Sequence, residues 1–230
     1  GIIISLNFLF LNNHTNIDYQ IKIFISIISF LLITSGLISS TIHLGHPERA
    51  WRALSQWKSS WLSREGIFAI ITYFPLTFFY FFWIFTERSV LTFLILLVAS
   101  TFCILTIFCT AKIYSSLKSI PAWHNPLVPP IYILNSLVLG SIITFTIFFY
   151  FGIKIKILSN FVTIICLTAL FIKLLYWSLI KKISKSNIET ATGLGDSKKT
   201  SFFEGPHTGK NFLTTEMINK INISKSLILR

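Results

Sequence analysis

Five long stretches of apolar residues, almost free of charge, constrain the fold of this chain more than any other feature. They lie at residues 23–41, 66–85, 90–111, 129–151 and 157–180. A helix needs about 20 consecutive apolar residues to cross the hydrocarbon core of a bilayer. A further apolar run at residues 2–11 is about half that length, and it is typical of the end of a span. The sequence predicts an all-α, multi-span integral membrane helix bundle with five full spans and a partial first one.

The composition supports a membrane protein and argues against a soluble one. Charged residues make up 12% of the chain and hydrophobic residues 53%, whereas soluble domains are about 25% charged. The formal net charge of +12 would raise nucleic-acid binding in a soluble protein. Here the cations lie mostly in connectors and in the tail, with no basic fold to present them. They are expected to set topology, meet anionic lipid or bind an acidic partner.

The apolar runs divide the chain into two parts. Residues 1–180 are expected to form the transmembrane helix bundle, with an interfacial connector at residues 41–66 between two spans. Residues 181–230 are expected to form a polar, basic surface loop or tail, because the composition changes there. Two glycine-rich segments of this tail lack the spacing of a phosphate-binding loop. The chain is expected to be incomplete at both ends.

The spans hold few groups that bind ions or metals. Lys173 is the one charged residue within them, and no span has a histidine in its interior. Ion-coupled transport and an intrinsic haem are therefore disfavoured, because both need such side chains inside the membrane. The three cysteines, Cys103, Cys109 and Cys166, form no C-x-x-C pair. We expect this chain to bind no metal and no cofactor of its own.

The connector at residues 41–66 is polar and aromatic, with the sequence T-I-H-L-G-H-P-E-R-A-W-R-A-L-S-Q-W-K-S-S-W-L-S-R-E-G. Pro47 suits the first position of a helix. Apolar residues follow on one face, at mostly three- or four-residue steps: Ala50, Trp51, Leu54, Trp57 and Trp61. This pattern predicts a short amphipathic helix in the membrane interface. Ser63 is expected to cap the next helix, with Glu65 in its first turn.

Two residues at the ends of this connector are candidates for binding a lipid-soluble quinol. His43 ends one span and Glu65 begins the next, on the same side of the membrane. Quinol oxidation releases two protons, and histidine accepts protons near neutral pH. A carboxylate can orient the histidine or pass the proton on. The alternative is structural, because a helix dipole alone favours a histidine at its C-terminus and a glutamate at its N-terminus.

A second connector, residues 112–130, is expected on the same side of the membrane, since two spans separate it from the first. It is also rich in aromatic residues and proline. The residues of both connectors that are candidates for contacts with the pocket or a partner are His46, Arg49, Arg52, Trp123 and His124. Their alternative roles are turn residues, contacts with lipid headgroups and anchors in the aromatic belt.

Two motifs carry a resemblance to a known family. The first is H-L-G-x-P-x-R-A at residues 43–50, followed by L-S-x-E ending at Glu65. The second is I-Y-x-S-L-x-x-I-P-x-W at residues 113–123, with a proline before the next span. In order and separation these motifs resemble the membrane anchor subunit of dimethyl sulfoxide reductase and its relatives. The resemblance is strong over residues 23–130 and elsewhere follows the order of apolar segments.

The resemblance implies a multi-pass anchor of the bacterial cytoplasmic membrane that binds no haem. Such an anchor oxidises a menaquinol-type quinol in anaerobic electron transport. It passes the electrons to an iron–sulfur subunit, which feeds a molybdopterin catalytic subunit. The anchor has no catalytic residues for the terminal acceptor. The quinol-site histidine and glutamate of the family match His43 and Glu65. The resemblance implies eight helices, whereas this sequence shows five full spans and a partial one.

Two alternatives to a quinol-oxidising anchor remain open from the sequence. The chain is a purely structural anchor without its own quinol site, or a small-molecule transporter. The side of the membrane that His43 faces is also open. The positive-inside rule places its connector in the cytoplasm. The resemblance to the best-known members of the family implies the opposite, with the connector and the partner subunits outside.

Overall fold

A computed structural model of the chain describes residues 1–12, 17–42, 47–86, 89–117, 120, 122–153 and 155–182. The chain separates into two units, Gly1–Ser184 and Lys185–Arg230, and the described residues all belong to the first. Every regular element in these residues is helical, in the order α1 (Ile2–Leu11), α2 (Tyr19–Ile42), the 3-10 helix η1 (Pro47–Gln56), α3 (Trp61–Phe85), α4 (Val90–Ser115), α5 (Val128–Tyr150) and α6 (Lys156–Lys182). The predicted all-α fold class is confirmed.

Five of these helices, α2 to α6, are long and apolar enough to cross a membrane. They correspond one for one to the five predicted spans. Many of their large apolar side chains face outward, including Leu31, Phe74 and Phe171. Exposed side chains of this kind are stable in lipid and costly in water. The chain is therefore a multi-pass membrane protein.

The N-terminal end of α3 differs from the prediction. The span expected to begin at Gly66 begins at Trp61, and its N-cap is Ser60 rather than Ser63. The Ser60 side chain accepts a hydrogen bond from the backbone N–H of Ser63, with a donor–acceptor distance of 3.4 Å. Polar residues that were expected in the connector are tolerated in this first turn because it lies at the end of the span. Glu65 consequently lies in the second turn of α3.

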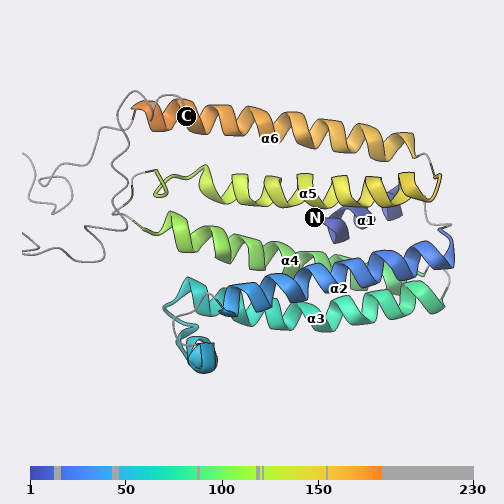
Figure 1. Cartoon of the computed structure of the whole chain (residues 1–230), viewed down its shortest axis with the longest axis horizontal. Coiled ribbons are helices and arrows are strands. Elements are labelled where there is room, and N and C mark those ends of the chain that lie inside the picture. The colour runs from blue at the N-terminus through green and yellow to red at the C-terminus, as the bar shows by residue number, and fades with distance from the viewer. Residues whose placement is uncertain are drawn as a thin grey trace, which may run out of the picture. The chain divides into compact units, whose positions relative to one another are not determined.

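The five long helices lie alongside one another, and each of α3, α4 and α5 packs against the next helix in the chain (Figure 1). The contact between α3 and α4 is the most extensive, and α2 packs against α3 and α5. Because successive helices alternate in direction, one end of the bundle gathers the C-terminal ends of α2, α4 and α6 with the N-terminal ends of α3 and α5. We call it the connector end. The prediction that the two aromatic connectors share one side is confirmed.

The short helix α1 fills the interior of the bundle. It packs against both α4 and α5, and Ser5, Leu6 and Leu9 are completely buried. At its far end Phe10 meets the rings of Phe79 and Trp83, with centroids 6.1 and 6.3 Å away. The partial first span of the sequence is thus a core element of the described structure.

Two glycines permit α1 to approach α5. A Cβ atom built on Gly140 would lie 2.2 Å from the backbone of Gly1, and one on Gly1 would lie 2.0 Å from the carbonyl oxygen of Ser136. Backbones meet this closely between membrane helices only where side chains are absent or very small. The pair therefore sets how deep α1 sits.

Candidate functional site

The candidate site begins at Glu65, a half-buried carboxylate in the second turn of α3. Its Oε1 accepts a hydrogen bond from Oγ1 of Thr110 on α4, at 2.7 Å. A carboxylate among apolar helices is costly and marks a functional site more often than an ordinary one. The helix dipole acts mainly within the first turn, and Ser60 already caps this helix. A role as a helix-end residue therefore explains Glu65 poorly.

Arg64, the cation next to Glu65 in the sequence, makes its contacts with other residues. Arg64 donates hydrogen bonds from Nε to the carbonyl of Trp57 at 2.9 Å and from Nη2 to that of Lys58 at 2.5 Å. Its guanidinium also lies 4.4 Å from the centroid of the Trp61 ring. These contacts join the connector to α3. Among the described residues no cation forms a salt bridge with Glu65, so its carboxylate is available to accept a proton.

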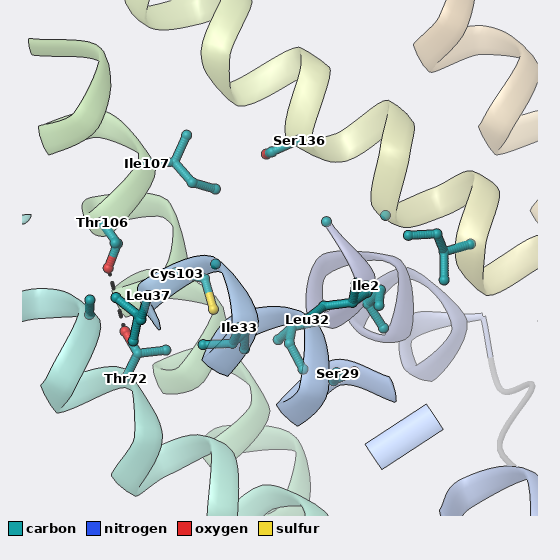
Figure 2. A pocket seen from close by; sticks show the side chains of 16 residues that line it. Ile2, Ser29, Leu32, Ile33, Leu37, Thr72, Cys103, Thr106, Ile107 and Ser136 are labelled. Atoms are coloured by element: carbon teal, nitrogen blue, oxygen red, sulfur yellow. Dashed lines mark hydrogen bonds between the residues drawn. The ribbon is translucent and has the colours of Figure 1, made fainter. Parts of the chain in front are cut away.

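A cavity of about 370 Å³ lies inside the bundle between α1, α2, α3, α4 and α5 (Figure 2). Its volume falls in the range of about 300–1,000 Å³ that is usual for small-molecule sites. Most of the lining is aliphatic, and Figure 2 shows Leu32, Ile33 and Leu37 of α2 beside it. The hydroxyl oxygens of Thr72 and Thr106, which both line the cavity, lie 3.5 Å apart. The cavity thus suits a flat, largely apolar molecule with a few polar atoms.

This cavity and Glu65 lie on the same helix faces. Ala69 and Thr72 line the cavity, and they follow Glu65 by four and seven residues along α3. On α4, Thr106 lines the cavity and precedes Thr110 by four residues. Residues with these spacings share one face of a helix. The Glu65–Thr110 pair therefore lies about one helical turn from the cavity, toward the connector end.

The structure places the other candidate residues as follows. His43 and His46 lie outside the described residues, so the pairing of His43 with Glu65 stays a prediction. Arg49 and Arg52 are exposed on η1, with Arg49 Nε 3.8 Å from Glu48 Oε1 and Arg52 5.4 Å from the Trp51 ring.

The predicted interfacial helix exists, but it is a 3-10 helix rather than an α-helix. It starts at Pro47 as expected. The side chains of Trp51 and Trp57 are 67% and 54% exposed. Exposure of this size agrees with tryptophans that lie at headgroup level.

Trp123 and His124 lie at the connector end, in the segment between α4 and α5. Trp123 packs edge-on against Tyr114, with ring centroids 5.3 Å apart, and lines a second cavity of about 260 Å³. His124 Nδ1 lies 2.8 Å from the carbonyl oxygen of Ser115. The expectation that these two residues border the same pocket as Glu65 stays a prediction.

Sequence reasoning missed the polar partner of Glu65 on α4, which is Thr110. Thr106 and Thr110 lie four residues apart in an apolar run, a spacing that puts two hydroxyl groups on one face. That signal was present, but Ser and Thr recur in every span. Nothing in the sequence selects Thr110 as the residue that meets Glu65.

No cluster of three or more His, Cys, Asp or Glu side chains within the described ranges could hold a metal ion. The three cysteines are unpaired, and they lie apart on α4 and α6. The expectation that this chain binds no metal stays a prediction.

Comparison with known proteins gives one family and one relative. The relative is a protein of Allochromatium vinosum that is named as a subunit of sulfite dehydrogenase, and the chain is 32% identical to it over 219 residues. This alignment covers 89% of the chain and spans 66% of the length of the relative. No solved structure matches the chain. The family model of the DMSO reductase anchor subunit (DmsC) matches residues 1–201. The chain, with its five spans and its two connector motifs, therefore belongs to the DMSO reductase anchor subunit family.

Proposed function

We propose that this chain is the quinol-oxidising membrane anchor of a DMSO-reductase-like molybdopterin oxidoreductase in a bacterial cytoplasmic membrane. Its donor is a menaquinol-type quinol. Its partners are an iron–sulfur subunit, which takes the electrons, and a molybdopterin subunit, which reduces the terminal acceptor in anaerobic electron transport. The observation that carries the proposal is the half-buried Glu65 carboxylate, held by Thr110 one turn from an apolar cavity.

The cavity accounts for quinol binding. A quinol ring is flat and apolar, and its two hydroxyl groups need hydrogen-bond partners when they leave water. The aliphatic lining buries the ring, while Thr72 and Thr106 supply polar atoms. A lipid-soluble molecule reaches such a cavity from the bilayer without crossing water.

Glu65 accounts for proton release. When quinol becomes quinone, two O–H bonds break, two electrons leave for the partner iron–sulfur subunit, and two protons remain. The Glu65 carboxylate accepts one proton, and Thr110 orients it for that purpose. His43 is the proposed second acceptor, at the other end of the connector. From the connector end both protons pass to water.

The opposite direction of electron flow is the second candidate. The relative from Allochromatium vinosum is named as part of a sulfite dehydrogenase, and a dehydrogenase removes electrons from its substrate. A site that binds both quinol and quinone serves either direction, because the same groups that accept protons from quinol return them to quinone. The direction then depends on the potential of the partner subunits.

The test is binding of a fluorescent quinol analogue to the chain in membranes, with Glu65→Gln and His43→Ala as variants. Glu48→Gln is the matched control, because Glu48 is an exposed carboxylate of the same connector. We expect saturable quenching by the parent chain and by the control, and about tenfold weaker binding in Glu65→Gln, as for loss of a charged hydrogen-bond partner.

Equal quenching in all variants would contradict the assignment of Glu65 and His43. Absence of quenching in the parent chain would favour the structural anchor. Uptake of a small solute by the chain without partners would favour the transporter. In the assembled complex, reduction of added quinone by the acceptor couple would identify the dehydrogenase direction.

A further inference from the structure

A second cavity, between α4, α5 and α6, differs in chemical character from the first. It has a volume of about 260 Å³ and lies between α4, α5, α6 and the connector that joins α4 to α5. Its polar lining comes from aromatic side chains and one lysine, namely Tyr114, Trp123, Tyr132, Lys173 and Tyr176. The quinol proposal uses none of these residues.

The aromatic walls of this cavity are fixed by contacts with one another. Tyr114 stacks on Tyr132 with ring centroids 5.6 Å apart and meets Trp123 edge-on at 5.3 Å. The Tyr176 hydroxyl donates a hydrogen bond to the backbone carbonyl of Ala122 at 3.0 Å. These contacts tie α4, α5, α6 and the connector together. A ligand would therefore enter a preformed site.

Lys173 gives the cavity a positive charge, and no element that lines the cavity carries a carboxylate to balance it. Its Nζ lies 5.4 Å from the ring of Tyr176 and 5.8 Å from that of Trp177. Among the described residues no carboxylate pairs with it. The reason is visible in the sequence, because no Asp or Glu occurs between Glu87 and Glu189. Every element that forms the cavity lies inside that interval.

A cation–π contact compensates only part of the cost of an ammonium group in an apolar environment. An anion from outside the chain would compensate the rest. Lys173 lies one turn before Trp177 and about 12 Å before Lys181 along the helix axis, in the half of α6 that runs toward the connector end. Tryptophan and lysine near a helix end are typical of the headgroup level of a bilayer. The anions at that level are lipid phosphates.

We infer that this cavity binds the phosphate group of an anionic phospholipid. The Lys173 ammonium pairs with the phosphodiester, and a tyrosine hydroxyl group of the wall, from Tyr114 or Tyr132, donates a hydrogen bond to one of its oxygens. The acyl chains lie along the outer face of α6, where Leu167, Leu170 and Phe171 are exposed. Bound lipid then joins α4, α5 and α6 at the connector end. This site is independent of the quinol proposal.

The test is native mass spectrometry of the full chain, released from micelles that contain phosphatidylglycerol or phosphatidylcholine. We expect the chain to retain one phosphatidylglycerol in preference to phosphatidylcholine. Lys173→Gln should reduce that preference about fivefold, as expected for one cation at a membrane surface. Lys156→Gln is the matched control, because Lys156 is an exposed lysine at the opposite end of α6, and it should leave the preference unchanged.

Lys173→Arg keeps the charge and should restore the preference, which separates ligand binding from a folding defect in Lys173→Gln. Equal retention of phosphatidylglycerol in the parent chain and Lys173→Gln would overturn the inference. Displacement of the lipid by inorganic phosphate would also overturn it and indicate a site for a soluble anion. Loss of quinol-analogue binding in Lys173→Gln, with lipid retention unchanged, would overturn it in favour of a quinol site.

Discussion

The Thr110 hydroxyl donates a hydrogen bond to the Glu65 carboxylate across the α3–α4 contact, at 2.7 Å. The two residues are 45 positions apart in the sequence, and they come from the connector motif and from the end of an apolar run. Their contact fixes the side-chain orientation of the one acidic residue that reaches into the bundle among those the structure describes. This relationship makes the site testable residue by residue.

Removing the Thr110 hydroxyl should weaken quinol-analogue binding. Thr110→Val keeps the shape of the side chain but leaves the Glu65 carboxylate without its donor. A hydrogen bond to a charged group contributes about 1.5–3 kcal/mol, so binding should weaken roughly tenfold or more. Thr101→Val is the matched control, since Thr101 lies exposed on the same helix and its hydroxyl donates to the carbonyl of Leu97 in that helix. Fluorescence quenching titrations measure the affinity of each variant for the analogue. Equal affinities of Thr110→Val and Thr101→Val would exclude a role for Thr110.

Filling the cavity should block binding without harm to the fold. Gly36 lines the cavity, and a Cβ atom added there meets nothing within 4 Å. Gly36→Leu should therefore place an apolar side chain in the space proposed for the quinol ring. Replacement of a helical glycine also favours folding by about 0.5–1 kcal/mol. We expect loss of analogue binding with an unchanged or raised Tm in detergent. Unchanged affinity would place the quinol outside this cavity.

The close approach of α1 and α5 should make Gly140 intolerant of any side chain. A Cβ atom at Gly140 would lie 2.2 Å from Gly1 backbone atoms, so α1 must move away from α5. Overpacking of this kind costs about 1–3 kcal/mol. Gly140→Ala should lower the Tm in detergent, whereas Gly36→Ala, which meets open space, should not. Equal Tm values for the two variants would show that α1 does not depend on this contact.

The cap of α3 distinguishes the structure from the sequence-based expectation. Ser60→Ala removes the side chain that accepts the Ser63 N–H, and loss of an N-cap costs about 1 kcal/mol. Ser63→Ala should be neutral or slightly stabilising, because the buried Ser63 hydroxyl has no hydrogen-bond partner among the described residues. Unfolding in denaturant measures both changes. A larger loss of stability in Ser63→Ala than in Ser60→Ala would support Ser63 as the N-cap, as expected from the sequence.

The sequence determined the fold class, the five spans and the family. Each of these depends on local information. The length of an apolar run either matches the thickness of a bilayer or does not, and the family motifs are short segments of sequence. The turn and cap residues at helix ends are also local, although several serines compete for one cap, as Ser60 and Ser63 do. Helix ends were therefore predicted to within a few residues.

Only the tertiary structure decided which side chains meet inside the bundle. Spans that are apolar all round carry no marked face, so the sequence does not set how each helix is rotated about its axis. That rotation follows from packing between neighbours, including the glycine contact of α1 with α5. It turns Thr110 toward Glu65, turns Thr106 toward the cavity, and brings Tyr114 and Lys173 to one aromatic pocket. The sequence by itself identified Glu65 as a candidate, and its donor and its cavity required the packed helices.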